Sequence, residues 1–252
     1  MIRSETNYKK TLFQVILFFI MTSSASAQLA FKKQQLTFPR VRDAYDDSWV
    51  NLQNQLKTAK FDGPFQLYLA AYKTEGLLEL WAKKIKDKEY RLFKTYKFCA
   101  HSGTLGPKVQ EGDYQTPEGI YYINVFNPMS NFHLSLGVNY PNAVDKKRSG
   151  TKRTGGDIYI HGNCVTVGCI PLTDEKIKEV YVLAVEAQNS GQTKIPVHIF
   201  PFKMNKENLD KFVAKFPQQK AFWTSLQPAY HLFEQHKTIP QTLVKEGKYT
   251  FK

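Results

Sequence analysis

The spacing of apolar residues changes at Phe65, and this change constrains the fold more than any other feature of the chain. Upstream, large apolar residues recur three or four positions apart, which is typical of one face of a helix over residues 41–60. They are Tyr45, Trp49, Leu52 and Leu56. Downstream, every second residue is apolar in 65–71 and in 78–82, with a turn around Gly76. This pattern predicts two adjacent strands.

Further short strands, separated by glycine and proline, are predicted at 90–98, 119–126, 158–160 and 196–200. The clearest internal helix is predicted at 173–188. Thr173 is a suitable N-cap there, and Asp174 and Glu175 favour the positive end of the helix dipole. Many short strands with few helices predict a mainly β domain with flanking helices, in the α+β class.

Composition and periodicity divide the chain into four parts. They are a targeting segment at 1–27, an N-terminal helical segment at 28–64, a main β domain at 65–200 and a C-terminal extension at 201–252. The extension is rich in Lys, Gln and Phe. Its patterning predicts helices around 206–216 and 228–237 and a final strand at 248–251.

The first 27 residues have the features of a cleaved secretion signal. Arg3, Lys9 and Lys10 precede an apolar run at 11–21, and Ala25-Ser26-Ala27 matches a signal-peptidase site. The apolar run is shorter than the about 20 residues that span a bilayer. We therefore expect cleavage near Ala27, no stable membrane insertion afterwards, and export to the periplasm or cell envelope.

The chain is basic, with a formal net charge of +13, of which the first 27 residues carry +2. Nucleic acid is a common partner of such proteins, but export and the lack of a recognisable nucleic-acid motif argue against it. An anionic cell wall or membrane surface is the partner class that fits. A basic surface is equally common among exported proteins that have no such partner.

Three cysteines in an exported protein leave at least one thiol free or paired with another chain. A disulfide between Cys99 and Cys164 would leave Cys169 free, and the sequence permits this pairing without requiring it. A free thiol in an oxidising compartment is at risk of oxidation, which favours a catalytic role for it.

His161, Cys164 and Cys169 lie close together, and three interpretations of this cluster are open. The first is simple packing, since unpaired cysteines often behave as small hydrophobic side chains. The second is a zinc site with a fourth ligand from His101, His133 or Cys99, but the paired Cys-x2-Cys spacing of such sites is missing. We therefore predict no metal and no cofactor here.

The third interpretation is nucleophilic catalysis. A cysteine attacks an amide carbonyl as the thiolate, and His161 stabilises the thiolate and returns the proton to the leaving amine. The backbone amides of Gly168 and Cys169 are suitable donors to the oxyanion. Glycines next to His161 and Cys169 open the backbone at both positions, which favours this interpretation over packing.

The cluster resembles the L,D-transpeptidase catalytic domain, also called YkuD, whose pattern is His-Gly, a spacer and then Ser/Thr-His-Gly-Cys. His161-Gly162 and Thr166-Val167-Gly168-Cys169 match that pattern. The resemblance implies that Cys169 is the nucleophile, that His161 is its base and that the Gly162 carbonyl orients the imidazole. It also implies a β-sandwich catalytic domain that acts on peptidoglycan stem peptides and is sensitive to carbapenems.

Further motifs resemble the murein L,D-transpeptidase subfamily named YafK, and with the catalytic stretch they cover roughly residues 65–200. They are Tyr96-Lys-Phe-Cys99, Ser102-Gly-Thr-Leu-Gly-Pro-Lys108, Glu111-Gly-Asp-Tyr-Gln-Thr-Pro-Glu-Gly119, His133-Leu-Ser and Tyr140-Pro-Asn-Ala. This branch is associated with hydrolysis, namely the release of protein attached to meso-diaminopimelate in the stem.

Three departures from the family pattern favour hydrolysis over cross-linking. The spacer between His161 and Cys169 is short, Val167 stands in place of a histidine, and Pro171 stands where an arginine often follows. We therefore expect an exported cysteine enzyme that passes an acyl group from Cys169 to an amine or to water. In the hydrolytic form it releases protein or an amino acid from meso-diaminopimelate. The alternative from another class is a non-catalytic wall-binding module.

Three residues are predicted to bind substrate. Arg153 suits a stem carboxylate because its guanidinium fork pairs with one, although a solvated loop charge explains it equally well. His133 lines the cleft or is a buried, hydrogen-bonded histidine. Thr166 occupies the Ser/Thr position of the family pattern. The expected partners are stem peptides and a wall-linked protein.

Overall fold

The computed structural model describes residues 30–252, so the predicted signal segment 1–27 lies outside the described residues. The strands are β1 (Phe65–Tyr72), β2 (Leu77–Lys84), β3 (Arg91–Lys97), β4 (Gly119–Asn127), β5 (Ser135–Val138), β6 (Tyr159–His161), β7 (Ile170–Pro171), β8 (Pro196–Phe200), β9 (Thr242–Lys245) and β10 (Lys248–Phe251). The helices are α2 (Pro39–Thr58), α3 (Ala143–Ser149), α4 (Asp174–Asn189), α5 (Lys206–Lys215), η1 (Pro217–Gln219) and α6 (Lys220–His236). Within 30–252, no helix is long and apolar enough to cross a bilayer.

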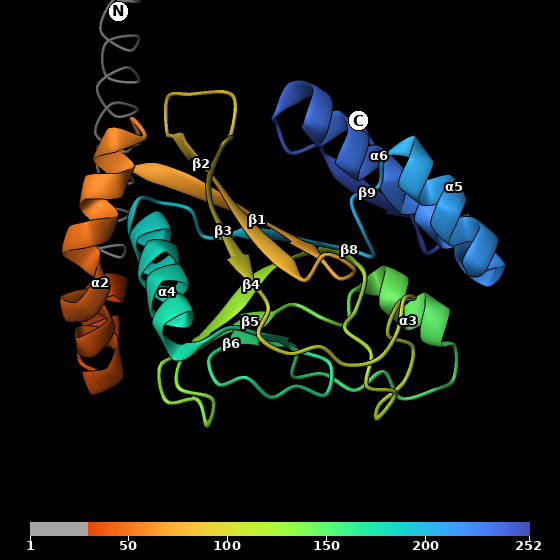
Figure 1. Cartoon of the computed structure of the whole chain (residues 1–252), viewed down its shortest axis with the longest axis horizontal. Coiled ribbons are helices and arrows are strands. Elements are labelled where there is room, and N and C mark those ends of the chain that lie inside the picture. The colour runs from red at the N-terminus through yellow and green to blue at the C-terminus, as the bar shows by residue number, and fades with distance from the viewer. Residues whose placement is uncertain (1–29) are drawn as a thin grey trace, which may run out of the picture.

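Eight strands form a mixed sheet in the order β3-β2-β1-β8-β4-β5-β6-β7, and β9 and β10 form a separate hairpin. β4 joins two parts of the large sheet, β3-β2-β1-β8 and β5-β6-β7. Residues 119–122 of β4 pair with β8, and the following residues pair with β5. The register shifts between Ile123 and Val125, where the two parts meet. The prediction of a mainly β domain with flanking helices is confirmed (Figure 1).

β1 is the centre of the molecule because its alternate residues belong to two different cores. Leu67 and Leu69 pack in one core with α2 and α4, and Tyr68 and Tyr72 pack in a second core with α6. Figure 1 shows α2 and α4 on one side of the sheet and α5 and α6 on the other. A strand covered on both sides has no polar face, which explains why nearly all of β1 is buried.

Helix α4 begins directly after Thr173, as predicted, with Asp174 and Glu175 in its first turn. It is largely buried and packs between the sheet and α2. The Tyr45 hydroxyl of α2 donates a hydrogen bond to Glu186 of α4 at 2.7 Å. Because α4 follows Cys169 by a few residues, its fixed position determines where the cysteine loop ends.

The C-terminal extension covers the second face of the sheet. Helix α6 is longer than predicted and begins at Lys220, because Pro228 inside the helix interrupts the apolar pattern. Trp223 and Phe233 of α6 are buried in the core that contains Tyr68. The Tyr249 hydroxyl of β10 accepts a hydrogen bond from the Ile120 amide at 3.2 Å.

The pairing of Cys99 with Cys164, which the sequence left open, is present as a disulfide, and Cys169 is free. The Cα atoms of the two bonded cysteines are 5.2 Å apart, and the bond closes a loop with a sequence separation of 65. Cys99 follows β3, and its amide donates a hydrogen bond to the Pro171 carbonyl at 3.1 Å. The disulfide therefore ties the residues after β3 to the loop between His161 and Cys169.

Replacing Cys99 and Cys164 together by serine is expected to lower the free energy of unfolding by about 2–4 kcal/mol, because the unfolded chain regains the freedom of a long loop. Guanidinium unfolding followed by circular dichroism measures this change. Cys169→Ser is the matched control, since it removes a thiol without opening a loop. An equal loss of stability in both variants would contradict the prediction.

His198 of β8 is expected to make stability pH-dependent. It is fully buried beside Tyr68, whose hydroxyl lies 3.0 Å from Nδ1, and burial lowers the pKa of His198 to about 3. An unfolded histidine titrates near ~6.5, so below that pH the unfolded chain binds a proton that the folded chain lacks. The contribution of His198 to the free energy of unfolding therefore falls as the pH falls below about 6.5. The loss is about 2 kcal/mol between pH 7 and pH 5.

The test compares unfolding of the wild type and His198→Phe at pH 7 and pH 5. The variant should lose this part of the pH dependence. Asp145→Asn is the control, because Asp145 affects the pH dependence of stability in the opposite direction. Burial raises the pKa of Asp145 to about 6, so its contribution to the free energy of unfolding grows as the pH falls below 6. An unchanged pH dependence in His198→Phe would rule out the assigned role of His198.

Candidate active site

Two short parallel strands bring His161 and Cys169 together. His161 ends β6, Cys169 directly precedes β7, and the register pairs Ile160 with Ile170. Cys169 thus lies beside Tyr159, whose amide is 3.4 Å from the cysteine sulfur. His161 is two residues along β6 from Tyr159, so the strand register places the His161 and Cys169 backbones on neighbouring strands.

The Cys169 thiol lies in a largely buried environment. Its sulfur accepts a hydrogen bond from the Tyr159 amide and contacts the Asp157 carbonyl, each at 3.4 Å. Burial raises the pKa of the thiol above its ordinary value, and the Tyr159 amide only partly offsets this effect. Cys169 is therefore a neutral thiol in the resting protein.

The imidazole of His161 is held in one tautomer. Its Nδ1 contacts the Gly162 carbonyl at 2.5 Å, and because a carbonyl oxygen can only accept, Nδ1 must carry the proton. Nε2 then has a free lone pair and can act as a base. The ring lies against Phe132, with ring centroids 4.7 Å apart, and burial lowers the pKa of His161. The residue is a neutral base at pH 7.

The loop before Cys169 is shaped by Thr166 and Gly168. The Thr166 hydroxyl donates to the Cys169 carbonyl at 2.9 Å and accepts from the Gly168 amide at 3.2 Å. Gly168 has a φ of 140°, and a Cβ there would lie 3.0 Å from the Gln115 carbonyl oxygen. Only glycine fits this approach. Thr166 thus holds the loop that carries Cys169.

The other two predicted binding residues lie apart from the cysteine. The Arg153 side chain is 88% exposed and forms an ion pair with Glu111 at 3.2 Å. His133 has its carbonyl bound by Arg40, and its buried Nε2 has no hydrogen-bond partner within the described residues. Burial lowers the pKa of His133. Neither residue lines the cavity at Cys169.

A cavity of about 370 Å³ opens at Cys169. Its lining comes from distant parts of the sequence, namely Lys73, Thr74, Phe98, Ala100, His101, Ser102, Gly103, Thr104, Leu105, Thr116, Phe212, Lys215 and Phe216. Sequence reasoning missed the three residues from α5 and its C-cap. The glycine-rich run at 102–108 was the only signal that pointed to the loop on the opposite side.

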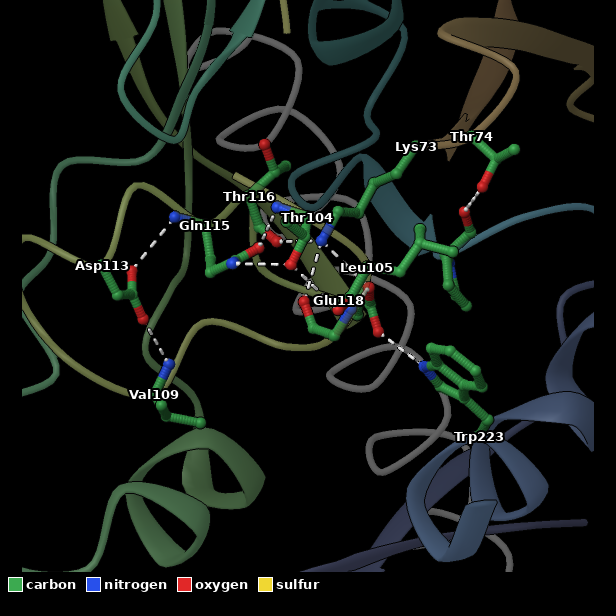
Figure 2. A network of polar contacts seen from close by, with 12 residues as sticks. Lys73, Thr74, Thr104, Leu105, Val109, Asp113, Gln115, Thr116, Glu118 and Trp223 are labelled. Atoms are coloured by element: carbon green, nitrogen blue, oxygen red, sulfur yellow. Dashed lines mark hydrogen bonds and ion pairs between the residues drawn. The ribbon is translucent and has the colours of Figure 1, made fainter. Parts of the chain in front are cut away.

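A buried ion pair fixes this loop (Figure 2). Lys73 Nζ donates to Glu118 at 2.9 Å and to the Gly106 and Thr116 carbonyls at 2.8 Å each. Glu118 also accepts from the Gly106 amide and from Trp223 Nε1, both at 2.8 Å. The loop between Gly106 and Glu118 is therefore tied to β1 on one side and to α6 on the other.

A second ion pair closes the same loop on itself. Lys108 Nζ lies 2.6 Å from Asp113. The Asp113 carboxylate also accepts the amides of Val109, Gln110 and Gln115 at 2.9, 3.0 and 3.1 Å. Burial acts to raise the pKa of Asp113, but the hydrogen bonds outweigh it and the pKa is lowered. Lys108 and Asp113 therefore hold the loop.

The zinc interpretation loses two of its ligands, because the disulfide occupies Cys99 and Cys164. Across residues 30–252, no group of three or more His, Cys, Asp or Glu side chains is arranged to hold a metal ion.

Two solved structures resemble the model only distantly. The helical cell shape determining protein Pgp2 (K307A mutant) of Campylobacter jejuni is 23% identical with a TM-score of 0.44, and covers 66% of this chain and 59% of that one. Bd1075 of Bdellovibrio bacteriovorus is 19% identical with a TM-score of 0.41, and covers 71% and 77%.

Sequence comparison is more specific. The family model for the L,D-transpeptidase catalytic domain, YkuD, matches residues 68–199, which include both His161 and Cys169. A protein of Escherichia coli K12 named "Putative L,D-transpeptidase YafK" is 35% identical over 185 residues, which is 73% of this chain and 72% of that protein. The chain belongs to the YkuD family of L,D-transpeptidase catalytic domains.

Proposed function

We propose that this protein is an exported cysteine enzyme that cleaves an amide bond in peptidoglycan stem peptides through an acyl-thioester on Cys169. The observation that carries the proposal is a free thiol that lines a cavity and immediately precedes β7, the strand that pairs with the strand ending at His161, whose tautomer is fixed by the Gly162 carbonyl. A nucleophile, a base and a residue that orients the base are the parts that covalent catalysis needs.

The first half of the reaction forms the thioester. The Cys169 sulfur bonds to the carbonyl carbon while His161 Nε2 takes the thiol proton, so that no free thiolate has to accumulate. The Cys169 amide, joined by the Gly168 amide once it leaves Thr166, donates to the oxyanion. When the carbon–nitrogen bond breaks, His161 gives the proton to the leaving amine.

The second half decides between transfer and hydrolysis. An amine or water attacks the thioester carbonyl, His161 takes its proton, and the Cys169 thiolate leaves and regains the proton. We favour water, and thus release of protein or an amino acid from meso-diaminopimelate. Val167, at a family histidine position, is 69% exposed and offers no group to activate or hold an amine. Arg153 is engaged by Glu111 on the surface.

Product analysis tests the outcome. Purified protein incubated with disaccharide-peptides and with protein-linked sacculi should yield trimmed stems or released adducts in mass spectra, and Cys169→Ala should reduce them to the uncatalysed background. The Cys99→Ser/Cys164→Ser double variant is the control that keeps the nucleophile. Cross-linked dimers would favour transfer.

Two results would contradict the proposal. Activity that survives Cys169→Ala in full, but is lost in Cys164→Ala, would mean that the nucleophile is wrongly assigned. Absence of any turnover, with salt-sensitive binding to sacculi that Cys169→Ala leaves unchanged, would favour the wall-binding module.

Because Cys169 and His161 are both neutral before substrate binds, we predict how the rate of Cys169 acylation depends on pH. Acylation by a carbapenem should speed up as the pH rises through the pKa of His161, which burial holds below its ordinary value, and should then level off near neutral pH. The raised pKa of Cys169 means that an unassisted thiol would instead react faster up to pH 9 and beyond.

Intact-protein mass spectrometry over pH 5–10 measures this acylation rate. His161→Gln is the matched variant. Its acylation rate should not level off near neutral pH but should rise over the whole range from pH 5 to pH 10. A wild-type rate that keeps rising tenfold per pH unit up to pH 9 would show that His161 is not the base.

A further inference from the structure

The cavity at Cys169 has one wall that lies outside the YkuD match. It is formed by Phe212 and Lys215 of α5 and by Phe216 at the C-terminal end of that helix, which line the cavity together with the segment from Phe98 to Leu105. The family model ends at residue 199. This wall is therefore a property of the C-terminal extension and not of the matched catalytic domain.

The extension wall is held in a defined place. Phe212 stacks on Phe202 with ring centroids 4.4 Å apart, and Phe216 meets the buried Trp223 edge-on at 6.0 Å. A Cβ on Gly106 would lie 2.9 Å from Gln219 Nε2, so η1 also rests closely on the opposite loop. These contacts fix the position of Lys215 relative to Cys169 through rigid aromatic rings.

The charges that face the cavity are positive. Lys215 lines the cavity and is exposed. Lys73 also lines the cavity, but Glu118 neutralises it at 2.9 Å. None of the residues 30–252 that line the cavity is Asp or Glu. Lys215 is therefore a cation without an acidic neighbour in the cavity, and the site favours an anion.

Two further features indicate the shape of that ligand. Phe98, Leu105, Phe212 and Phe216 give the cavity apolar sides, which suit a chain of methylene groups. Ser102 lines the cavity, and its hydroxyl oxygen is buried and has no hydrogen-bond partner within the described residues. A buried hydroxyl without a partner is costly, and a polar ligand group would satisfy it.

We propose that this cavity is a substrate subsite for an aliphatic amino-acid residue that bears a free carboxylate, with Lys215 of α5 as the counter-ion. The proposal rests on the proposed function, because the ligand is the part of the stem peptide next to the scissile amide. Lys215 acts here as a specificity-determining residue and takes no part in proton transfer.

The test uses pairs of stem peptides that differ by amidation of one carboxylate at a time. Amidation of the carboxylate that pairs with Lys215 should lower kcat/KM of the wild type by about 5- to 10-fold, mainly through a higher KM, as expected for loss of one partly exposed charge pair. With Lys215→Gln, the free and the amidated peptide of that pair should both give the lower kcat/KM, and kcat should not change. Lys215→Arg should restore the preference for the free carboxylate.

Lys211→Gln is the matched control, since Lys211 lies on the same helix and is exposed but does not line the cavity. It should behave as the wild type. If the wild type cleaves stem peptides and Lys215→Gln still prefers the free carboxylate, or if no amidation changes KM, the subsite is wrong while the proposed function stands. If the wild type cleaves none of the peptides, the proposed function itself fails.

Discussion

The buried pair of Lys73 and Glu118 is the interaction on which the site depends. Lys73 directly follows β1, Glu118 directly precedes β4, and Trp223 of α6 binds the same carboxylate. A buried ion pair is weak evidence for stability, because apolar side chains of similar volume can replace one at little cost. Its value lies in geometry. Each donor and acceptor has a fixed direction, so the pair sets the loop against which Gly168 packs.

Burial has opposite effects on the two reactive groups, and both effects keep them neutral. It raises the pKa of Cys169 and lowers that of His161. In the exported setting proposed for this chain, a neutral thiol resists oxidants better than a thiolate does. Cys99 and Cys164 form the disulfide that holds the loop between His161 and Cys169 in place. In the proposed mechanism, reactivity depends on a substrate that brings a carbonyl within reach, because His161 removes the thiol proton only as the new bond forms.

Sequence alone predicted the periodic elements, and it is also the origin of the proposed pair of His161 and Cys169. β1, β2 and α4 have strong periodicity, and His161 and Cys169 are close in the chain. β5 and β7 have only four and two residues, too few to show a period, and they were missed. The ion pair of Arg153 with Glu111 could not be predicted, because the two residues are distant in sequence. The position of Lys215 at the cavity could not be predicted for the same reason, since no local pattern indicates that α5 returns to Cys169.

The match to the family ends at residue 199, yet the packing does not. Tyr68 and Tyr72 of β1 would face water without α6, and the Glu118 carboxylate would lose Trp223. The change of composition at residue 200 therefore marks no break in the structure. The matched part contains Cys169 and His161, the nucleophile and base of the proposed reaction. The extension supplies one wall of the cavity at Cys169, so in the proposed function it can direct the same reaction to a particular substrate without changing the matched fold.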